Sequence, residues 1–325
     1  MQNSTQTAEV ASYKFEGIAH AISAVSHLGD STGGTISVFR REKMLVDGRI
    51  MEIPVISGNS IRGLLRDRGM RFMLRALGDP VLSPGAFDFL TSGGALSKTA
   101  GRGIDIGFAR RLRNLIPLVG IFGGACGNQI PPGKLQVGKW YPVCTEMRSK
   151  LPLAVRDLPE AALSVFDMTD LHSFTRTDDK KNDHMQKWLP APERTLLEAP
   201  NVTKDKEGRE VAKKEPAQQM RYTQEVLIAG VKFSCWFLLQ DVTPLEKAAF
   251  ASALYEWSKA PFIGGQSRHG LGLIELDLSN WMQVMPLARF AEAESERFAL
   301  SPAEEYEQHL TSAKADILAV LKEVQ

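Results

Sequence analysis

A glycine-rich loop near the end of the chain carries the residue types best suited to hold an anion. From Pro261 to Leu276 the sequence reads PFIGGQSRHGLGLIEL, with Arg268 and His269 between its glycines. Glycine permits positive φ angles and close approach of another backbone, and successive backbone N–H groups in such a loop can surround an anion. The pattern is typical of a phosphate-binding loop, although a simple tight turn is also compatible with it.

A second segment pairs a helix start with a run of arginines. It extends from Ile53 to Arg75 and reads IPVISGNSIRGLLRDRGMRFMLR. We expect a short strand that stops at Ser57-Gly58, with Asn59 or Ser60 as the cap of the helix that follows. Helix N-termini favour anions, and arginines along the rims of the apolar stripe would add guanidinium groups. The alternative is an ordinary solvated basic face.

Composition excludes several classes of protein. The 325 residues are 43% hydrophobic and 24% charged, as in ordinary soluble globular proteins. The sequence contains no apolar run long enough to span a membrane, and its first residues, MQNSTQTAEV, do not resemble a secretory signal. Cys126, Cys144 and Cys235 lie far apart and form no CxxC pair, which argues against a disulfide framework and a zinc site. These features predict a protein of the reducing cytoplasm.

The net charge of +1 averages two unlike parts of the chain. Residues 291–325 hold eight acidic and three basic side chains, a net charge of −5, so the remainder carries +6. A basic body with an acidic tail suits a polyanion binder whose tail packs elsewhere on the chain or on a neighbouring subunit.

Periodicity and turn signals predict a β-α-β-β-α-β order with long insertions, as in ferredoxin-like or RNA-recognition-type folds. A glycine-rich, irregular stretch is expected at 86–132, and a polar excursion at 172–219. Residues 36–46 are expected to form a hairpin or a loop. The core elements are expected as strands at 13–28, 134–145, 221–240 and 271–278, with helices after Ser57 and over 243–257.

The segments IPVISGNSIRGLLR and FIGGQSRHGLGLIEL together resemble the signature of the repeat-associated (RAMP) superfamily. Within it, the chain is most similar to the backbone subunit of class 1 CRISPR effector complexes, and its length and acidic tail favour the type IV subunit. The Ile121-Phe122-Gly123 turn before the strand at Leu135 also fits, and the resemblance covers about residues 13–278.

The resemblance implies an α+β, hand-shaped protein with a ferredoxin-like palm, inserted fingers and a long thumb hairpin. The boundaries it implies are 1–78 for the first half of the palm, 79–134 for the fingers, 135–171 for a palm strand and connection, 172–219 for the thumb, 220–280 for the second half of the palm and 281–325 for an acidic helical segment.

The function that the resemblance implies is that of a prokaryotic, cytoplasmic subunit that binds guide RNA without cofactor or metal. Copies would assemble into a helical filament along the RNA, beside other effector subunits, and present the RNA to a target nucleic acid. Each thumb would push between nucleotides and displace one base. In such a subunit the protein holds the RNA backbone while base pairing reads the sequence.

The same resemblance assigns roles to individual residues. The guide-RNA contacts would be Ser60, Arg62 and Arg66 at the helix, Gly264, Gly265, Gln266, Ser267, Arg268 and His269 in the loop, and Arg40, Arg41, Lys98 and Arg102 in basic, flexible contexts. Met185 and Trp188 would form the wedge of the thumb.

One departure from the family pattern concerns catalysis. Type III members cleave target RNA with an aspartate after the first strand, whereas the matching stretch 34–41 here has Ile36 or Ser37 at that place. Asp30 lies upstream and would match only if the alignment slips. We therefore expect no nuclease activity, and a DNA target is favoured over RNA.

Enzymatic alternatives remain open at this point. A relative that processes guide RNA would use His20, His27 or His269 as a general base. A ribonuclease of the type III kind would need Asp30 and a divalent metal. A nucleotide-binding enzyme is disfavoured, because the loop lacks the lysine of GxxxxGK[ST] and no GxGxxG follows the first strand.

Overall fold

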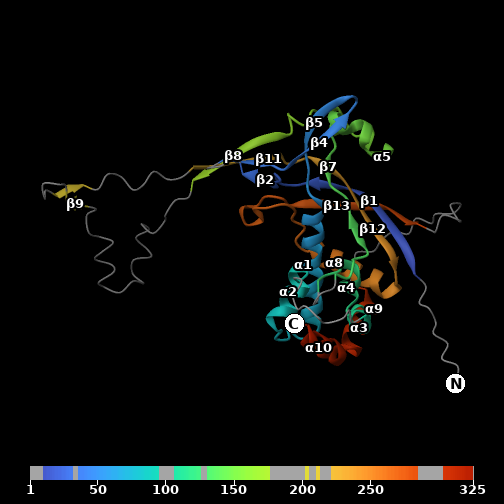
Figure 1. Cartoon of the computed structure of the whole chain (residues 1–325). Helices are drawn as coiled ribbons and strands as arrows, with labels where there is room; N and C mark the ends of the chain where they lie inside the picture. The colour runs from blue at the N-terminus through green and yellow to red at the C-terminus, as the bar shows by residue number, and fades with distance from the viewer. Residues whose placement is uncertain are drawn as a thin grey trace, which may run out of the picture.

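The protein is built around an antiparallel sheet with two long helices packed against each other (Figure 1). The computed structural model describes residues 10–31, 36–94, 106–125, 130–175, 202–204, 210–212, 221–284 and 303–324. The sheet has the order β13–β1–β12–β6, formed by β1 (Ala11–Ala21), β6 (Leu135–Val137), β12 (Lys232–Val242) and β13 (Ile274–Val284). The short strand β7 (Tyr141–Pro142) also pairs with β12.

The two helices follow the strands as the sequence predicts. Helix α1 (Gly58–Ala76) comes after β1, and α8 (Pro244–Ser258) comes after β12. The resulting order β1-α1-β6-β12-α8-β13, with the fourth strand beside the first, is the ferredoxin-like arrangement. The predicted α+β fold class is therefore confirmed.

Local sequence explains where both helices begin. Thr243 Oγ1 accepts a hydrogen bond from the Glu246 backbone N–H at 3.2 Å, and Glu246 Oε2 accepts from the Thr243 N–H at 2.9 Å, which forms a capping box before α8. Helix α1 is capped by Ser57, whose Oγ accepts from the Ser60 N–H at 3.2 Å. The expectation that Asn59 or Ser60 caps this helix is wrong, because the chain turns into the helix directly after Ile56 pairs with Trp140.

Aromatic side chains fill the space between the sheet and α8. Phe15 on β1 and Phe237 on β12 are fully buried, and their rings lie 5.7 Å and 6.1 Å from Phe250 of α8. Trp140 packs at 6.2 Å against both Phe237 and Trp257. Pairs at these separations contribute beyond their buried area. This aromatic layer holds the sheet and α8 in one unit.

Residues 221–240 form two strands, so the prediction of one long strand is wrong. Strand β11 (Arg221–Leu227) ends at a turn in which Gly230 has a φ of 92°, and β12 begins only at Lys232. Buried apolar residues continue across the turn, with Val226 and Leu227 before it and Val231 after it, so the sequence shows no clear break between the strands. The order of the second sheet is β2–β3–β11–β8, with β2 (Leu28–Ser31), β3 (Ile36–Phe39) and β8 (Thr169–Thr175) beside β11.

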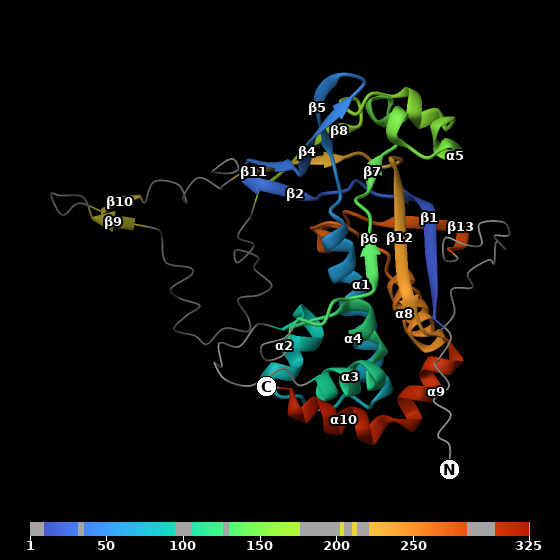
Figure 2. The ribbon, with the colours of Figure 1, turned by 45° about the vertical axis from the view of Figure 1, so that its right-hand side comes forward.

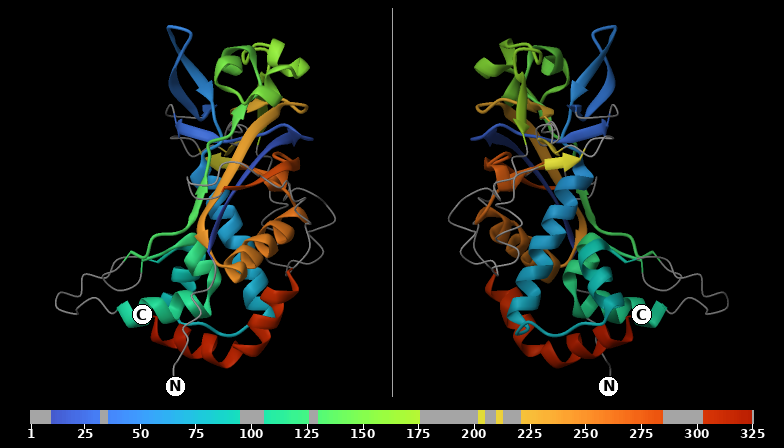
Figure 3. Two further views of the ribbon diagram at one scale, coloured as in Figure 1. Left: turned by 90° about the vertical axis from the view of Figure 1, so that its right-hand side faces the viewer. Right: turned by 90° about the vertical axis from the view of Figure 1, so that its left-hand side faces the viewer.

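A helical part lies at the end of α1 that is remote from the second sheet (Figures 2 and 3). It contains α2 (Pro84–Ser92), α3 (Ile106–Leu115), α4 (Pro117–Phe122), α9 (Glu304–Ser312) and α10 (Lys314–Glu323). The expectation of an irregular 86–132 is thus corrected, because Ser83 and two prolines start helices among the glycines. The described part of the acidic tail, residues 303–324, packs on its own chain, since Tyr306 stacks on Phe72 at 6.1 Å and Glu323 pairs with Arg111.

Smaller elements complete the described chain. They are the hairpin of β4 (Arg41–Val46) and β5 (Arg49–Pro54), the helical turns η1 (Thr145–Lys150), α5 (Leu153–Arg156), η2 (Pro159–Ala162) and η4 (Ser267–His269), and the pair β9 (Val202–Lys204) and β10 (Glu210–Ala212). Within the described ranges, none of the helices combines the length and apolarity that a membrane span requires. The boundaries of palm, fingers and thumb stay predictions.

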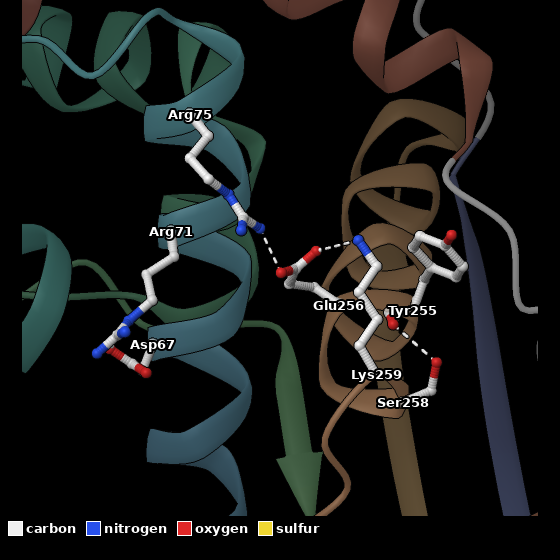
Figure 4. A network of polar contacts seen from close by, with 7 residues as sticks. All are labelled: Asp67, Arg71, Arg75, Tyr255, Glu256, Ser258 and Lys259. Carbon is white, nitrogen blue, oxygen red and sulfur yellow. Dashed lines mark hydrogen bonds and ion pairs between the residues drawn. The ribbon is translucent and has the colours of Figure 1, made fainter.

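A polar network joins α1 to α8 (Figure 4). The carboxylate of Glu256, whose side chain is 8% exposed, accepts hydrogen bonds from Arg75 and from Lys259 Nζ, the latter at 2.8 Å. Burial works to raise the pKa of Glu256, and the bonds from Lys259 and Arg75 outweigh it, so the pKa is lowered. On the outer face of α1, Arg71 pairs with Asp67 at 2.9 Å in an exposed bridge.

We expect Glu256→Gln to destabilise the fold by about 1–2 kcal/mol, because it removes a buried charge-assisted bridge between α1 and α8. The effect should be full above the ordinary carboxyl pKa of 4.5 and should fade as pH falls through the lower pKa of the folded protein. Urea unfolding of both proteins at several pH values measures it. The matched control Asp67→Asn breaks an exposed bridge and should cost less than about 0.5 kcal/mol. Equal losses in the two variants would contradict this account.

Candidate nucleic-acid interface

The glycine loop is anchored on the segment that follows β1. Backbone N–H groups of Gly265 and Gly272 donate to the carbonyls of Ser26 and Ala24 at 2.7 Å and 2.8 Å. In return, the Ile22 N–H donates to the Leu273 carbonyl at 2.8 Å. The loop is closed on itself where the Ile263 N–H donates to the Gly272 carbonyl at 2.9 Å. Loop 262–273 is therefore a fixed part of the fold, held along residues 22–27.

Two of the glycines are required by this close approach. Gly264 and Gly272 have φ angles of 70° and 84°, in the left-handed region that favours glycine. A Cβ at Gly264 would lie 2.1 Å from the Ser26 carbonyl oxygen, and one at Gly272 would lie 2.1 Å from that of Ile263. A side chain at either position would push the loop off its anchor.

His27 connects the anchored loop to the N-terminus of α1. Its Nε2 accepts a hydrogen bond from the Ser57 backbone N–H at 3.2 Å, so the imidazole is neutral at that nitrogen. The edge of the ring packs on Phe39, with centroids 6.2 Å apart. Burial, and to a smaller extent the charge of Arg40, lower the pKa of His27. The two sequence motifs thus meet through Ser26, His27 and Ser57, which we call the junction.

Exposed polar and basic side chains lie next to the junction, in the loop and beside His27. Ser267, Arg268 and His269 form the exposed turn η4 at the tip of the loop. Arg40 is exposed directly beside His27, whose carbonyl accepts from the Arg40 N–H at 2.7 Å. Within the described ranges, neither Arg40 nor Arg268 has an acidic partner in an ion pair. We call these four residues the basic surface.

Two predicted phosphate ligands, Arg62 and Arg66, point into the protein. Their Nη2 atoms both donate to the Phe122 carbonyl, at 2.6 Å and 2.7 Å. Arg66 also donates to the Gly123 carbonyl at 2.8 Å, is only 8% exposed, and has its pKa lowered to about 10 by burial and by the charge of Arg62. Arg66 therefore links α1 to the end of α4 through hydrogen bonds, and its buried guanidinium group is not available to RNA. In the sequence, the helical spacing places Arg66 beside the apolar stripe of α1. The spacing does not show that the carbonyls of Phe122 and Gly123 lie opposite this side chain.

The remaining predicted residues are distributed as follows. Arg41 forms a half-buried ion pair with Glu225, which also accepts from the Phe39 N–H at 2.9 Å, so its charge is compensated. Ser60 is half-buried at the start of α1 and Gln266 precedes η4 with a φ of 62°. The residues that lie outside the described chain are Lys98, Arg102, Met185 and Trp188.

Groups proposed for catalysis do not converge on one site. His20 lies on β1, in register with Lys232 and Glu275, and Asp30 belongs to β2. Burial raises the pKa of the Cys144 thiol to about 12, and that of the Cys235 thiol as well. Within the described ranges, no three His, Cys, Asp or Glu side chains gather as they would around a metal ion.

Ser57 is the functional residue that the sequence reasoning missed. The sequence contains a signal for this cap, because a serine followed by a glycine at the end of an apolar run is typical of a helix N-terminus. His27 was considered only as a general base. Its contact with the Ser57 backbone N–H joins segments 30 residues apart and leaves no local pattern in the sequence.

Comparison with known proteins identifies the fold. No protein-family model and no curated protein sequence matches the chain. Among solved structures, the chain is similar to one described as "Type IV-B CRISPR Complex", with a TM-score of 0.55 and 21% sequence identity over 86% of this chain and 93% of the other. A likeness at this identity shows that the two chains share their fold.

We expect the stability of the protein to fall as pH drops below 6.5, the ordinary pKa of histidine, because the folded protein holds His27 neutral while the unfolded chain takes up a proton. Above that pH the contribution of His27 is complete. In His27→Gln the amide oxygen can still accept from Ser57, but the side chain does not titrate, so the decline should be shallower. Chemical unfolding from pH 5 to 8 measures the slope, and the exposed His172→Gln serves as control. A slope unchanged by His27→Gln would contradict the role of the junction.

Proposed function

We propose that the protein is a non-catalytic subunit that binds guide RNA in a class 1 CRISPR effector complex. The observation that carries this proposal is the junction, which fixes a glycine loop beside a capped helix N-terminus, with exposed Arg268 in the loop and exposed Arg40 beside His27. Such a surface can hold a phosphate backbone through amide groups and guanidinium groups without reading bases.

The positive charge at the start of α1 also supports an RNA-binding role. Arg62 and Arg66 lie one and two turns into α1 and share a carbonyl, and burial, with the charge of Arg62 as the smaller cause, lowers the pKa of Arg66. The Nε of Arg62 is buried and has no hydrogen-bond partner within the described ranges. The positive charge of this arginine pair is therefore only partly compensated by hydrogen bonds. An RNA phosphate near the start of α1 would offset the repulsion between the two arginines through its charge, although both guanidinium groups point into the protein.

The shared fold supports a role in an assembly. One solved structure to which this chain is similar is described as "Type IV-B CRISPR Complex". For this chain we propose the corresponding arrangement, in which copies line up along a guide RNA as a helical filament, beside other effector subunits. A target presented to such a filament would be recognised by pairing with the RNA, and DNA is the favoured target.

A non-catalytic role fits the neighbourhoods of His27 and His269 better than ribonuclease chemistry. His27 uses Nε2 to accept from a backbone N–H, so that atom is not available to a 2′-hydroxyl. His269 is exposed and packs its edge on Phe174 at 5.8 Å, a position suited to contact with RNA. The stretch 34–41 contains no carboxylate.

Arg40→Ala and Arg268→Ala should each weaken binding of single-stranded RNA roughly three- to tenfold, whatever its sequence, because each removes a phosphate contact. Each should also reduce the slope of log affinity against log salt by about 0.7. Fluorescence anisotropy at several salt concentrations measures both quantities. Arg71→Ala is the control, because this arginine is exposed on α1 but paired with Asp67. If all three variants bind like the parent, the basic surface is not the RNA site.

The protein alone should leave guide-RNA precursor and target RNA intact, with or without a divalent metal. Labelled RNA recovered at full length after prolonged incubation would agree with this. Metal-independent cleavage that His269→Ala abolishes would establish a processing enzyme instead. Metal-dependent cleavage that Asp30→Ala abolishes would establish a ribonuclease.

A further inference from the structure

A partly buried carboxylate lies close to the basic surface, and the proposed RNA contacts do not use it. Glu225 belongs to β11, and its side chain is only 15% exposed. Its Oε2 accepts a hydrogen bond from the Phe39 backbone N–H at 2.9 Å, and its Oε1 accepts one from Arg41. These two partners flank Arg40, the exposed arginine beside His27. Glu225 therefore holds the chain on either side of a predicted phosphate contact.

The local topology explains why a side chain is needed at this point. Strand β3 pairs in parallel with β11, and the last pair of that ladder is Ser37 with Gln224. Beyond it, the Phe39 N–H at the end of β3 is bonded by the Glu225 side chain. A carboxylate has two acceptor oxygens, so it can bond to a backbone N–H and to a guanidinium group at the same time. One side chain thus ties the end of β3 and the start of β4 to β11, beside which the hairpin of β4 and β5 rises (Figure 2).

The backbone of Arg40 is fixed by further hydrogen bonds. Its N–H donates to the His27 carbonyl at 2.7 Å, and its carbonyl accepts from the Val55 N–H at 2.9 Å. The ring of Phe39 is buried and packs against His27. With Glu225 bound to both neighbours, the backbone of Arg40 is held in one place relative to the junction while its side chain is exposed. A side chain with a fixed base loses less conformational entropy when it binds a phosphate.

The charge of Glu225 and its position make opposite predictions for RNA binding. A negative charge close to the basic surface repels phosphate and also neutralises Arg41, so on charge alone the loss of this carboxylate would strengthen binding. A side chain that positions Arg40 would weaken binding when it is removed, although the surface becomes more basic. The sign of the effect therefore separates the two roles.

We propose that Glu225 is a positioning residue for RNA binding, which fixes the backbone around Arg40 so that this arginine reaches a phosphate of the bound strand. The inference rests on the proposed RNA-binding function and extends it to a residue that does not itself contact the RNA. An acidic side chain thus increases the affinity for a polyanion through the geometry that it imposes on a neighbouring base.

Two substitutions at Glu225 test the proposal in the full chain. Glu225→Gln keeps the size of the side chain, removes its charge and leaves one acceptor oxygen for two donors. Glu225→Asp keeps the charge but is shorter by one methylene, and so is too short to reach both donors. Each variant should bind single-stranded RNA about two- to fivefold more weakly than the parent in fluorescence anisotropy. Parental affinity of Glu225→Asp, together with parental or tighter binding by Glu225→Gln, would overturn the proposal.

Combination with the arginine variants distinguishes positioning from a general loss of structure. The loss caused by Glu225→Gln should disappear or change sign when Arg40→Ala is already present, because there is then no arginine to position. The same loss should remain in full when Arg268→Ala is present, because Arg268 lies in the glycine loop, which Glu225 does not hold. A loss of equal size in both backgrounds would show that Glu225 serves the fold alone.

Glu52 provides the matched control. It lies on β5, which pairs with β4, and its side chain is 59% exposed and 3.9 Å from Lys43. Within the described ranges it accepts from no backbone N–H. Glu52→Gln removes the same charge without releasing the backbone, so it should bind RNA as the parent does or slightly more tightly. If Glu52→Gln weakens binding as much as Glu225→Gln does, the effect is not one of position and the proposal is overturned.

The outcomes also separate this inference from the function on which it rests. If the parent binds RNA and Arg40→Ala weakens that binding, while both Glu225 variants bind as the parent does, only this inference fails. If the parent does not bind RNA at all, both the function and the inference fail.

Discussion

The candidate site depends on the hydrogen bonds that hold loop 262–273 against residues 22–27. These bonds place the exposed turn η4 at a fixed position, and His27 extends the same contact to the cap of α1. The close approach leaves no room for a side chain at Gly264 or Gly272, so the glycines are part of the anchor rather than a source of flexibility. A surface made ready before the ligand arrives loses less conformational entropy on binding.

The ferredoxin-like core explains why this anchor is rigid. β1 leads directly into residues 22–27, β13 leads directly out of the loop, and the two strands are neighbours over most of their length. The aromatic layer around Phe250 and Trp257 and the Glu256 network fix α8 and α1 on this sheet. Any movement of the loop relative to α1 would therefore strain well-packed elements on both sides.

The sequence predicted the order of the core elements because each carried its own signal. The Thr243-Pro244 start of α8 is a local signal, and so is the apolar alternation of β1. The start of α1 was found from the end of an apolar run, although its cap is Ser57 and not Asn59 or Ser60. The prediction was wrong at 221–240, where apolar residues continue across the turn between two strands, and at 86–132, where three helices lie among glycines.

Site prediction was limited in a comparable way. Residue type and a glycine-rich or flexible context suffice to propose Arg40, Arg268 and His269, which are exposed. These features of the sequence do not distinguish the three exposed residues from Arg66. Its position along the helix is typical of a surface arginine, but its guanidinium group donates to the carbonyls of Phe122 and Gly123. The partners of Arg41 and His27 also come from distant segments. Such contacts are set by topology, which no single stretch of sequence contains.

The central claim is that RNA lies across the junction. Photochemical cross-linking of a bound single-stranded RNA to the full chain, followed by mapping of the modified peptides, tests it most directly. We predict cross-links in loop 262–273, above all at His269, and in the segment around Arg40. Cross-links confined to the helical part, in α2, α3, α9 and α10, would contradict the account.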